Sequence, residues 1–422
     1  MKAPGEPTDV LAHVPAGADL IVPVLLGEPH TVMDALEAHA DRLEGVHVHQ
    51  MDPTRPRAYI DGAFPGRLEH VSYFLGPGCR EAYANGTCEL VPAHFSELPL
   101  LLRRATRPAL VLAAASMPDR HGYFSLGTNA DYVASFIGEV PFFIEANARM
   151  PRTCGENQVH MGEVAGWCTA DYALHESPPA VPGARDEQIA AFVAERVPDG
   201  ACLQIGVGRI PNALLAALRG RSDLGLHTEA MADGVMDLVE SGALTGARKR
   251  QQRNKHVATF CKGTRRMFDW LDDNRSVALL PVDWVNNPRV VAQEPNFVSI
   301  NATREVDLMG QAASETIAGR YWSGSGGQAD FARGAMYSDG GMAFLVTHAA
   351  TSRGISRIAT RLTPGSAVTN LKNTVDHVVT EHGVAELRGR SLSRRAEALI
   401  AIAHPDHRDR LRREAREAGL LR

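Results

Sequence analysis

One stretch of the chain, residues 203–233, carries the pattern that most restricts the fold. It begins with a short apolar run that ends in glycines and a proline (LQIGVGRIP), continues with a helix-like run, and closes with a second apolar run (LGLHTEA). Two short apolar runs separated by a helix predict neighbouring strands of an open α/β sheet. Ligands of such sheets bind at the carboxyl ends of the strands. Because Glu229 comes where the second strand should end, we expect it to lie at a ligand site.

Alternating strands and helices are predicted along the rest of the chain. Strands are expected at residues 18–26, 46–50, 71–73, 89–91, 110–115, 142–145, 297–301, 344–347, 367–369 and 375–380. Helices are expected at residues 30–43, 131–137, 186–195, 233–240 and 393–403, with Asp233 as a candidate N-cap. This alternation indicates a mostly parallel sheet.

A weak internal repeat suggests that the fold occurs twice. The sequence PAGADL at residues 15–20 returns as PDGACL at residues 198–203. After a one-residue slip, Pro29 is also matched by Pro211. Self-similarity of this kind indicates two copies of one α/β domain, although the identities are few enough for chance to be the alternative.

The proline-rich segment SPPAVPG at residues 177–183 is the predicted linker. A chain of 422 residues is too long for one ordinary core. We therefore expect an α/β fold with two tandem domains, each with an open and mostly parallel sheet, at residues 1–182 and 183–422.

The composition narrows the functional class. The net charge of −5, with 44% hydrophobic and 22% charged residues, is typical of a globular protein and argues against nucleic acid or an anionic membrane as the main partner. No apolar run approaches the roughly 18 residues of a membrane span, and residues 1–9 do not resemble a signal peptide. The six cysteines are scattered without metal-ligand spacing. A cytoplasmic protein is expected.

Two glycine-rich segments fall outside familiar nucleotide and hydrolase motifs. In GVGRIP, residues 206–211, a proline replaces the third glycine of the dinucleotide fingerprint. A tight turn and an anion cradle both fit this segment. In SGSGG, residues 323–327, the nucleophile-elbow pattern is broken and the P-loop lysine is missing. A flexible loop and a close approach to a ligand both fit that segment.

Residue types alone leave the role of Glu229 open. Together with His227 and Asp233 it could suggest a metal cluster, but no second histidine pair or HExxH helix accompanies them. We expect no metal. A single carboxylate at a strand end is also often a helix cap or a member of a salt bridge.

Several long stretches, taken in order, resemble the acetyl-CoA hydrolase/transferase family. They are residues 203–211 (LQIGVGRIP), 223–238 (DLGLHTEAMADGVMDL), 299–311 (SINATREVDLMGQ), 323–335 (SGSGGQADFARGA), 379–391 (VTEHGVAELRGRS) and 398–406 (ALIAIAHPD). The resemblance runs from about residue 15 to residue 412. It implies two domains of the NagB/RpiA/CoA-transferase type and Glu229 as the catalytic glutamate.

The resemblance also implies roles for the glycine segments and their neighbours. Residues that would hold the reacting carbonyl or the substrate are Gln204, Gly206, Gly208, Arg209 and His227. Residues against which coenzyme A would pack are Gly324, Gly326, Gly327 and Gln328. The substrates would be an acyl-CoA donor and a carboxylic acid acceptor, with no tightly bound cofactor and with a homodimer or a larger homo-oligomer as the assembly.

The implied activity is transfer of coenzyme A between short-chain carboxylic acids, such as acetate, butyrate and 4-hydroxybutyrate. The route would be ping-pong, through an acyl–glutamyl anhydride and a glutamyl-CoA thioester. One alternative is an acyl-CoA hydrolase that uses the same glutamate, and another is an inactive CoA-binding protein.

The chain departs from the family pattern at Arg209, His382 and His407. Arg209 could pair with the second carboxylate of a dicarboxylic acyl group such as succinyl or itaconyl, or it could point to solvent. The roles of the two histidines stay open.

Overall fold

The chain forms two compact units. The computed structural model describes residues 3–422. Unit 1 consists of Met1–Pro178 and Val257–Val285, and unit 2 consists of Pro179–His256 and Asn286–Arg422. Unit 1 thus takes up a later segment in addition to the N-terminal half. The domain boundary that the sequence suggests between residues 182 and 183 stays a prediction.

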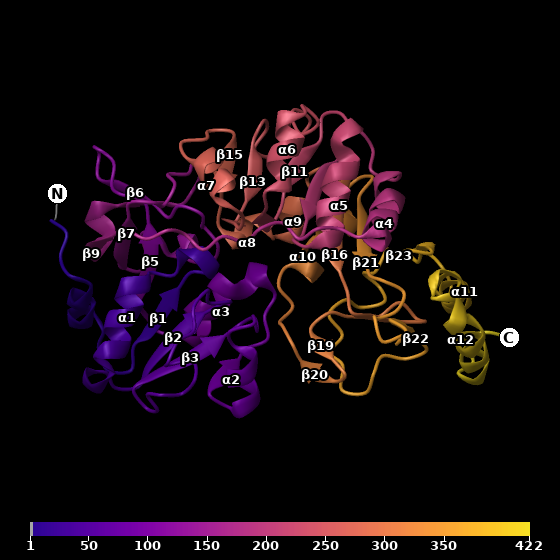
Figure 1. The fold of residues 1–422 in the computed structure, drawn as a ribbon, viewed down its shortest axis with the longest axis horizontal. Helices are drawn as coiled ribbons and strands as arrows, with labels where there is room; N and C mark the ends of the chain where they lie inside the picture. The colour runs from indigo at the N-terminus through magenta and orange to yellow at the C-terminus, as the bar shows by residue number, and fades with distance from the viewer. Residues whose placement is uncertain (1–2) are drawn as a thin grey trace. The chain divides into compact units, whose positions relative to one another are not determined.

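A parallel sheet forms the centre of unit 1, with the strand order β4-β3-β2-β1-β5-β7-β9 (Figure 1). Every neighbouring pair in it is parallel. The strands of unit 1 are β1 (Asp19–Val22), β2 (Val46–Gln50), β3 (Leu68–Ser72), β4 (Cys88–Leu90), β5 (Pro108–Ala115), β6 (Tyr123–Ser125), β7 (Phe142–Asn147), β8 (Gln158–His160), β9 (Val164–Ala170), β14 (Phe260–Cys261) and β15 (Val277–Leu279). β13 (His256–Ala258) begins at the end of a unit 2 segment.

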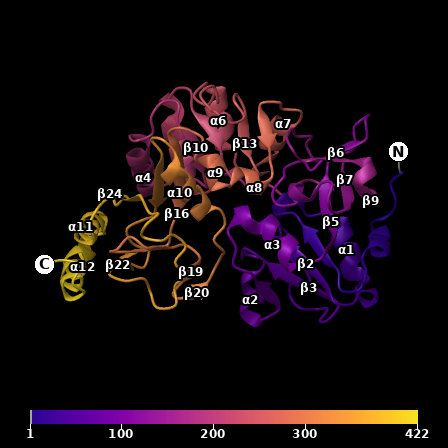
Figure 2. The ribbon, with the colours of Figure 1, turned by 180° about the vertical axis from the view of Figure 1, so that it is seen from behind.

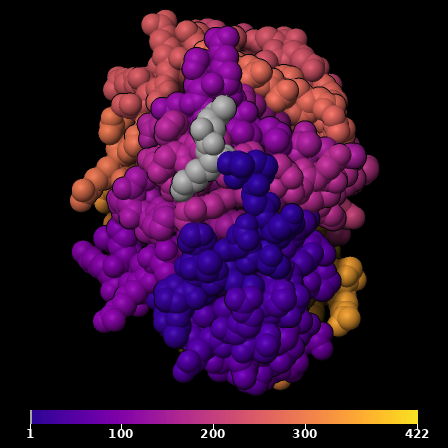
Figure 3. Space-filling view, turned by 90° about the vertical axis from the view of Figure 1, so that its left-hand side faces the viewer, coloured from indigo at the N-terminus to yellow at the C-terminus, as the bar shows by residue number. Residues whose placement is uncertain are grey.

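Helices connect several of the parallel strands of unit 1, whereas β2 and β3 are joined by the irregular residues 51–67. The helices of unit 1 are α1 (His30–Ala38), α2 (Arg80–Asn85), α3 (Leu98–Ala105), α7 (Arg265–Leu271) and α8 (Val282–Val285), together with 3₁₀ turns η1 (Pro7–His13), η2 (Leu25–Gly27), η3 (Ala40–Arg42), η4 (Phe95–Glu97), η5 (Ala134–Phe136) and η6 (Met161–Glu163). Leu20, Val48 and Leu112 from the middle strands are fully buried in the core. The N-terminal segment, indigo in Figure 3, is attached where the Gly5 N–H donates to the Trp167 carbonyl oxygen at 2.9 Å.

Unit 2 contains a second sheet with the order β11-β10-β16-β21-β23-β24. Its pairs are parallel except for the terminal β23–β24 hairpin. The strands of unit 2 are β10 (Cys202–Ile205), β11 (Gly225–His227), β12 (Ala230–Met231), β16 (Phe297–Ala302), β17 (Glu305–Asp307), β18 (Ala312–Ala313), β19 (Thr316–Ile317), β20 (Arg320–Tyr321), β21 (Met342–Val346), β22 (Ile358–Ala359), β23 (His377–Thr380) and β24 (Gly383–Glu386).

Helices pack against this sheet; α10 contacts β16 and β21, and Figure 2 shows α10 beside β16. The helices of unit 2 are α4 (Ala184–Ala194), α5 (Arg209–Ala217), α6 (Gly234–Glu240), α9 (Pro288–Val291), α10 (Gln328–Tyr337), α11 (Leu392–Ile402) and α12 (Pro405–Glu417), with the 3₁₀ turn η7 (Leu218–Gly220). Within residues 3–422, no helix is both long enough and apolar enough to cross a membrane.

The two copies of the sequence repeat occupy equivalent places in the two sheets. β1 lies between β2 and β5, and β10 lies between β11 and β16, each with two parallel neighbours. A helix follows each of these strands, α1 in unit 1 and α5 in unit 2. The predicted fold class, tandem and mostly parallel α/β sheets, is therefore confirmed.

Two local predictions are wrong. The helix predicted at residues 131–137 is a turn followed by the short 3₁₀ turn η5. The buried Asp131 carboxylate accepts a hydrogen bond from the Val133 N–H at 2.9 Å, and such local bonds compete with helix formation. The strand predicted at residues 367–369 is irregular. Its Thr369 N–H donates to the Ala312 carbonyl oxygen at 2.9 Å.

Candidate active site

Glu229 lies just after the carboxyl end of β11, next to the end of β10. These two strands pair in parallel. Beyond the pair, the Thr228 hydroxyl donates to the Ile205 carbonyl oxygen at 3.0 Å and accepts from the Ile205 N–H at 3.3 Å. Because Ile205 immediately precedes the glycine turn at residues 206–208, these bonds attach Glu229 and that turn to the same edge of the sheet.

Two groups donate hydrogen bonds to the Glu229 carboxylate. The Asn286 side-chain nitrogen lies 2.7 Å from Oε2, and the Gly327 backbone N–H is the second donor. Burial raises the pKa of Glu229 to about 7, although both hydrogen bonds act to lower it. A carboxylate deprived of solvent in this way is a better nucleophile than one exposed to water.

Gly327 approaches Glu229 so closely that a side chain does not fit. A Cβ atom added there would lie 2.2 Å from Glu229 Oε2 and 2.1 Å from the Asn286 side-chain nitrogen. Gly327 is the residue before α10, and Gly326 before it has a φ of +53°, in the left-handed region that favours glycine. The segment at residues 323–327 thus brings the N-terminal end of a helix to the carboxylate. Of the glycines predicted to bind coenzyme A, Gly327 is the one that contacts Glu229.

The turn at residues 206–208, at the start of α5, has a glycine on each side of the exposed Val207. Gly208 has a φ of +130°, which residues with a side chain rarely adopt. A Cβ atom at Gly208 would meet no heavy atom within 4 Å among residues 3–422. Gly208 is the N-cap residue and has no side chain that could cap the helix. The helix N-terminus therefore offers unfilled N–H groups to an anion or a developing oxyanion.

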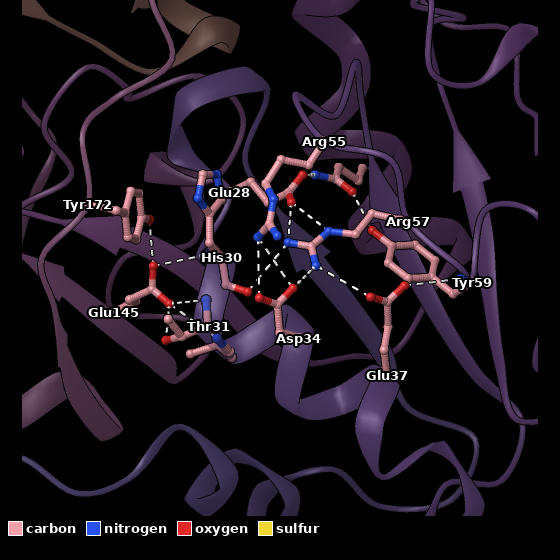
Figure 4. Close-up of polar contacts among 12 residues, drawn as sticks. Glu28, His30, Thr31, Asp34, Glu37, Arg55, Arg57, Tyr59, Glu145 and Tyr172 are labelled. Carbon is pink, nitrogen blue, oxygen red and sulfur yellow. Dashed lines mark hydrogen bonds and ion pairs between the residues drawn. The ribbon is translucent and has the colours of Figure 1, made fainter.

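The equivalent helix in unit 1 shows the opposite arrangement (Figure 4). There the buried Glu145 carboxylate accepts from the backbone N–H groups of His30 at 2.9 Å, Thr31 at 2.6 Å and Val32 at 3.1 Å, at the start of α1. Tyr172 donates to the same carboxylate. In unit 1 the protein's own carboxylate fills the helix N-terminus, whereas in unit 2 the glycine turn leaves it accessible. This contrast favours the anion cradle over a mere tight turn at residues 206–208.

Two predicted amide residues belong to hydrogen-bond networks near the glycine segments. Gln204, on β10, exchanges hydrogen bonds with the Asn301 amide at 2.9 and 3.2 Å and accepts from the Ser299 hydroxyl at 2.7 Å. Gln328 donates to Ser314 at 2.9 Å and to Asn370 at 2.8 Å. These hydrogen bonds fix the carboxyl end of β10 and the start of α10. Direct binding of substrate by either amide stays a prediction.

His227 and Arg209 have different surroundings. The His227 side chain is buried, and its ring meets the Phe297 ring edge-on, with centroids 6.0 Å apart. Arg209 is exposed in the first turn of α5. The pKa of Asp186 is lowered, against the effect of burial, by the Gly183 N–H, by His348 and least by the charge of Arg209. A substrate contact by either residue stays a prediction.

The two unusual histidines belong to one cluster of rings. The His382 and His404 centroids are 5.6 Å apart, and the His404 and His407 centroids are 5.9 Å apart. His407 also lies 2.9 Å from the Gly354 carbonyl oxygen. The three rings thus connect the β23–β24 turn to the start of α12.

Asn286 and Thr228 were not identified from the sequence. Asn286 follows α8, and its fully buried side chain reaches Glu229 from a part of the chain 57 residues away. The adjacent Asn287 has a recognisable role as N-cap before Pro288, but no local pattern distinguishes Asn286. Only the fold brings Asn286 to the carboxylate.

Unit 1 contains a separate cavity of 410 Å³, whose lining includes Leu25, Leu26, Arg55, Arg57 and Lys262. The charge of Arg57 is balanced within the protein, because its guanidinium pairs with buried Glu28, at 2.7 Å from Nε, and also with Asp34 and Glu37 (Figure 4). The cavity is large enough for a small ligand.

Comparison with known proteins covers nearly the whole chain. The family model described as "Acetyl-CoA hydrolase/transferase N-terminal domain" matches residues 5–182. The model described as "Acetyl-CoA hydrolase/transferase C-terminal domain" matches residues 263–415. Glu229 lies between the two matched ranges.

Full-length relatives bridge that gap. Succinyl-CoA:cyclohexane-1-carboxylate CoA transferase of Geobacter metallireducens is 40% identical over 419 residues, covering 98% of this chain and 95% of the relative. 4-Hydroxybutyrate coenzyme A transferase of Clostridium kluyveri is 38% identical, covering 92% and 91%. The crystal structure of RipA from Yersinia pestis superposes with a TM-score of 0.93 at 33% identity, covering 99% and 98% of the two chains.

Proposed function

Because this chain belongs to the acetyl-CoA hydrolase/transferase family and is a CoA-transferase acting between carboxylic acids, we propose that it transfers coenzyme A by a covalent route through Glu229. The observation that carries the proposal is the placement of one half-buried carboxylate at a strand end, fixed by Asn286 and the Gly327 N–H. Both hydrogen-bond donors are uncharged, so neither forms an ion pair that would make the Glu229 carboxylate less nucleophilic.

In the first half-reaction, a Glu229 carboxylate oxygen attacks the carbonyl carbon of the acyl-CoA thioester. The C–S bond breaks, coenzyme A leaves as the thiolate, and an acyl–glutamyl anhydride forms. The thiolate then attacks the glutamyl carbonyl carbon of the anhydride. This step releases the first carboxylate and leaves a glutamyl-CoA thioester.

In the second half-reaction, the acceptor carboxylate attacks the glutamyl thioester, and the same steps run in reverse. The new acyl-CoA leaves, and Glu229 returns as a carboxylate. Charge is conserved at each step, because one anion enters for every anion that leaves. The chain's own groups therefore need only to orient the carboxylate, stabilise the oxyanions and exclude water.

The glycine turn at residues 206–208 supports oxyanion stabilisation in this scheme. Two of its three residues, Gly206 and Gly208, have no side chain. It leads into α5 and starts at the same sheet edge as Glu229. One well-placed donor contributes about 3–4 kcal/mol to such a transition state. The segment at residues 323–327 supports the approach of coenzyme A, because Gly324 and Gly326 are partly exposed and lead to Gly327 at the carboxylate.

Short-chain acids such as acetate, butyrate and 4-hydroxybutyrate are the proposed exchange partners. The exposed position of Arg209 fits both a solvent-facing role and recognition of a second carboxylate. Rates of Arg209→Ala with butyrate and succinate as acceptors separate these readings. An unchanged ratio of the two rates would show that Arg209 does not select dicarboxylic acids.

The activity is tested by incubating the protein with butyryl-CoA and isotope-labelled acetate. We expect labelled acetyl-CoA to form as butyrate appears, and we expect Glu229→Gln to abolish it. Glu386→Gln, which changes an exposed carboxylate on β24, is the matched control and should retain activity. Release of free coenzyme A that is independent of the acceptor would instead indicate hydrolysis.

A further inference from the structure

A second cluster of reactive side chains lies in unit 1, within one strand–helix–strand segment. His70 on β3 and Cys88 on β4 are direct partners across a parallel pair. Cys79 is the residue before α2, the helix that connects these two strands. The topology therefore brings together three residues that no short sequence motif links.

The three side chains point at one another in the protein interior. One imidazole nitrogen and the two sulfur atoms all lie within 4.8 Å of one another. His70, Cys79 and Cys88 are 1%, 0% and 3% exposed, and both cysteines are free thiols. Two sulfur ligands and one nitrogen ligand thus converge on one point.

The orientation of His70 suits a ligand. Its Nε2 lies 3.2 Å from the Gln50 carbonyl oxygen, so Nε2 carries the proton and donates to that oxygen. Nδ1 is then unprotonated, and it lies 3.2 Å from Cys88 Sγ. The Tyr59 ring, edge-on at 5.8 Å between centroids, holds the imidazole from the side. Metal-binding histidines are commonly fixed by this kind of bond from the second ring nitrogen to a backbone carbonyl.

We propose that His70, Cys79 and Cys88 form a binding site for a thiophilic divalent cation, zinc(II) being the best match. Two thiolates and one imidazole are ligands that zinc prefers, whereas magnesium and calcium prefer oxygen. Three protein ligands leave a fourth tetrahedral position for water or another oxygen ligand. The cation would join β3, α2 and β4 as a structural clip.

Charge balance favours a divalent cation in this buried place. Binding forms two metal–sulfur bonds and one metal–nitrogen bond, and releases the two thiol protons to solvent. Two thiolates then neutralise the 2+ charge, so that no net charge is left in the core. Because protons are released, the affinity rises with pH.

The proposal is tested on the full-length, fully reduced protein after removal of bound metal. Cadmium(II) is added in steps, each equilibrated to completion because the ligands are buried, and the thiolate-to-metal charge-transfer absorbance is followed. We expect saturation at one equivalent and loss of the band when zinc(II) is added in competition. Absence of a band in folded, reduced wild-type protein would overturn the proposal without any variant.

Variants locate the site. Cys79→Ser and Cys88→Ser each remove a ligand, so each should weaken binding by more than the about 10- to 100-fold that loss of an outer-shell partner costs. Cys202→Ser, at a buried cysteine of unit 2, is the matched control and should leave the affinity unchanged. A band that persists in the Cys79→Ser/Cys88→Ser double variant would overturn the proposal. So would isolation of the protein with Cys79 and Cys88 joined as a disulfide, seen as a loss of two hydrogen masses in the linked peptides.

Discussion

The Asn286 side-chain nitrogen donates to Glu229 Oε2 at 2.7 Å, while the Asn286 Oδ1 atom is buried without a hydrogen-bond partner among residues 3–422. A buried acceptor without a partner lowers the free energy of unfolding. The position of the Asn286 amide therefore reduces the stability of the fold. The bond it makes holds Oε2 of the carboxylate in one direction. The orientation of Glu229 therefore depends on Asn286.

Asn286→Ala should lower transferase activity. A hydrogen bond to a charged group contributes about 1.5–3 kcal/mol, so we expect kcat/KM to fall about 10- to 100-fold. Asn287→Ala is the control, because it removes the N-cap of α9 and not the contact with Glu229. Equal losses of activity in both variants would show that Asn286 acts through folding alone.

Gly327→Ala should reduce activity while the protein still folds. The added methyl group would lie 2.2 Å from Glu229 Oε2, so the carboxylate must move. A displacement of about 1 Å from the reactive geometry costs about 100-fold in rate. Gly220→Ala is the control, since its methyl group meets no atom within 4 Å among the described residues. Full activity in Gly327→Ala would contradict the close approach at Glu229.

The rate should depend on pH through the ionisation of Glu229. The group attacks as a carboxylate, and burial raises its pKa to about 7. We expect kcat/KM to fall about tenfold per pH unit below 7 and to level off above it. Measurements at saturating acceptor, between about pH 5.5 and 8.5, test this expectation. A rate that does not change over that range would show that the pKa of the attacking group lies outside it.

The free energy of unfolding should fall as pH rises, whereas the rate of transfer should increase. The folded protein holds the Glu229 proton up to a higher pH than the unfolded chain, whose carboxyl group has the ordinary pKa of 4.5. The free energy of unfolding therefore decreases as pH rises from about 4.5 to 7, by at most about 3 kcal/mol, and the loss is complete above pH 7.

Glu229→Gln removes this ionisation. The variant should be more resistant to urea than wild type at pH 8, and the difference should vanish near pH 4. Glu386→Gln, at an exposed position, should show no such pH-dependent difference. Equal stability of wild type and Glu229→Gln at pH 8 would mean that the carboxylate is well solvated.

The sequence was informative where one local pattern decides the structure. The strand predicted at residues 46–50 is β2 with the observed bounds, and α6 begins one residue after the predicted start. The repeat placed β1 and β10 in equivalent positions. The predicted cap was right in position only, because the Asp233 side chain makes no capping bond within the described residues.

Features that depend on distant residues were missed. Asn286 reaches Glu229 across 57 residues of sequence, and His70 meets Cys88 only because their strands are paired in register. Spacing along the chain contains no signal for either contact. The helix predicted at residues 131–137 failed partly for a related reason, since Asp131 accepts from the distant Val24 N–H in addition to the local Val133 N–H.

The central claim is that Glu229 becomes covalently linked to coenzyme A. Intact-protein mass spectrometry after mixing the protein with butyryl-CoA, without an acceptor acid, tests it most directly. We predict an adduct with the mass of coenzyme A less one water, mapped to Glu229 by peptide analysis and absent from Glu229→Gln. Active transfer to added acetate with no adduct on Glu229 under the same conditions would contradict the account.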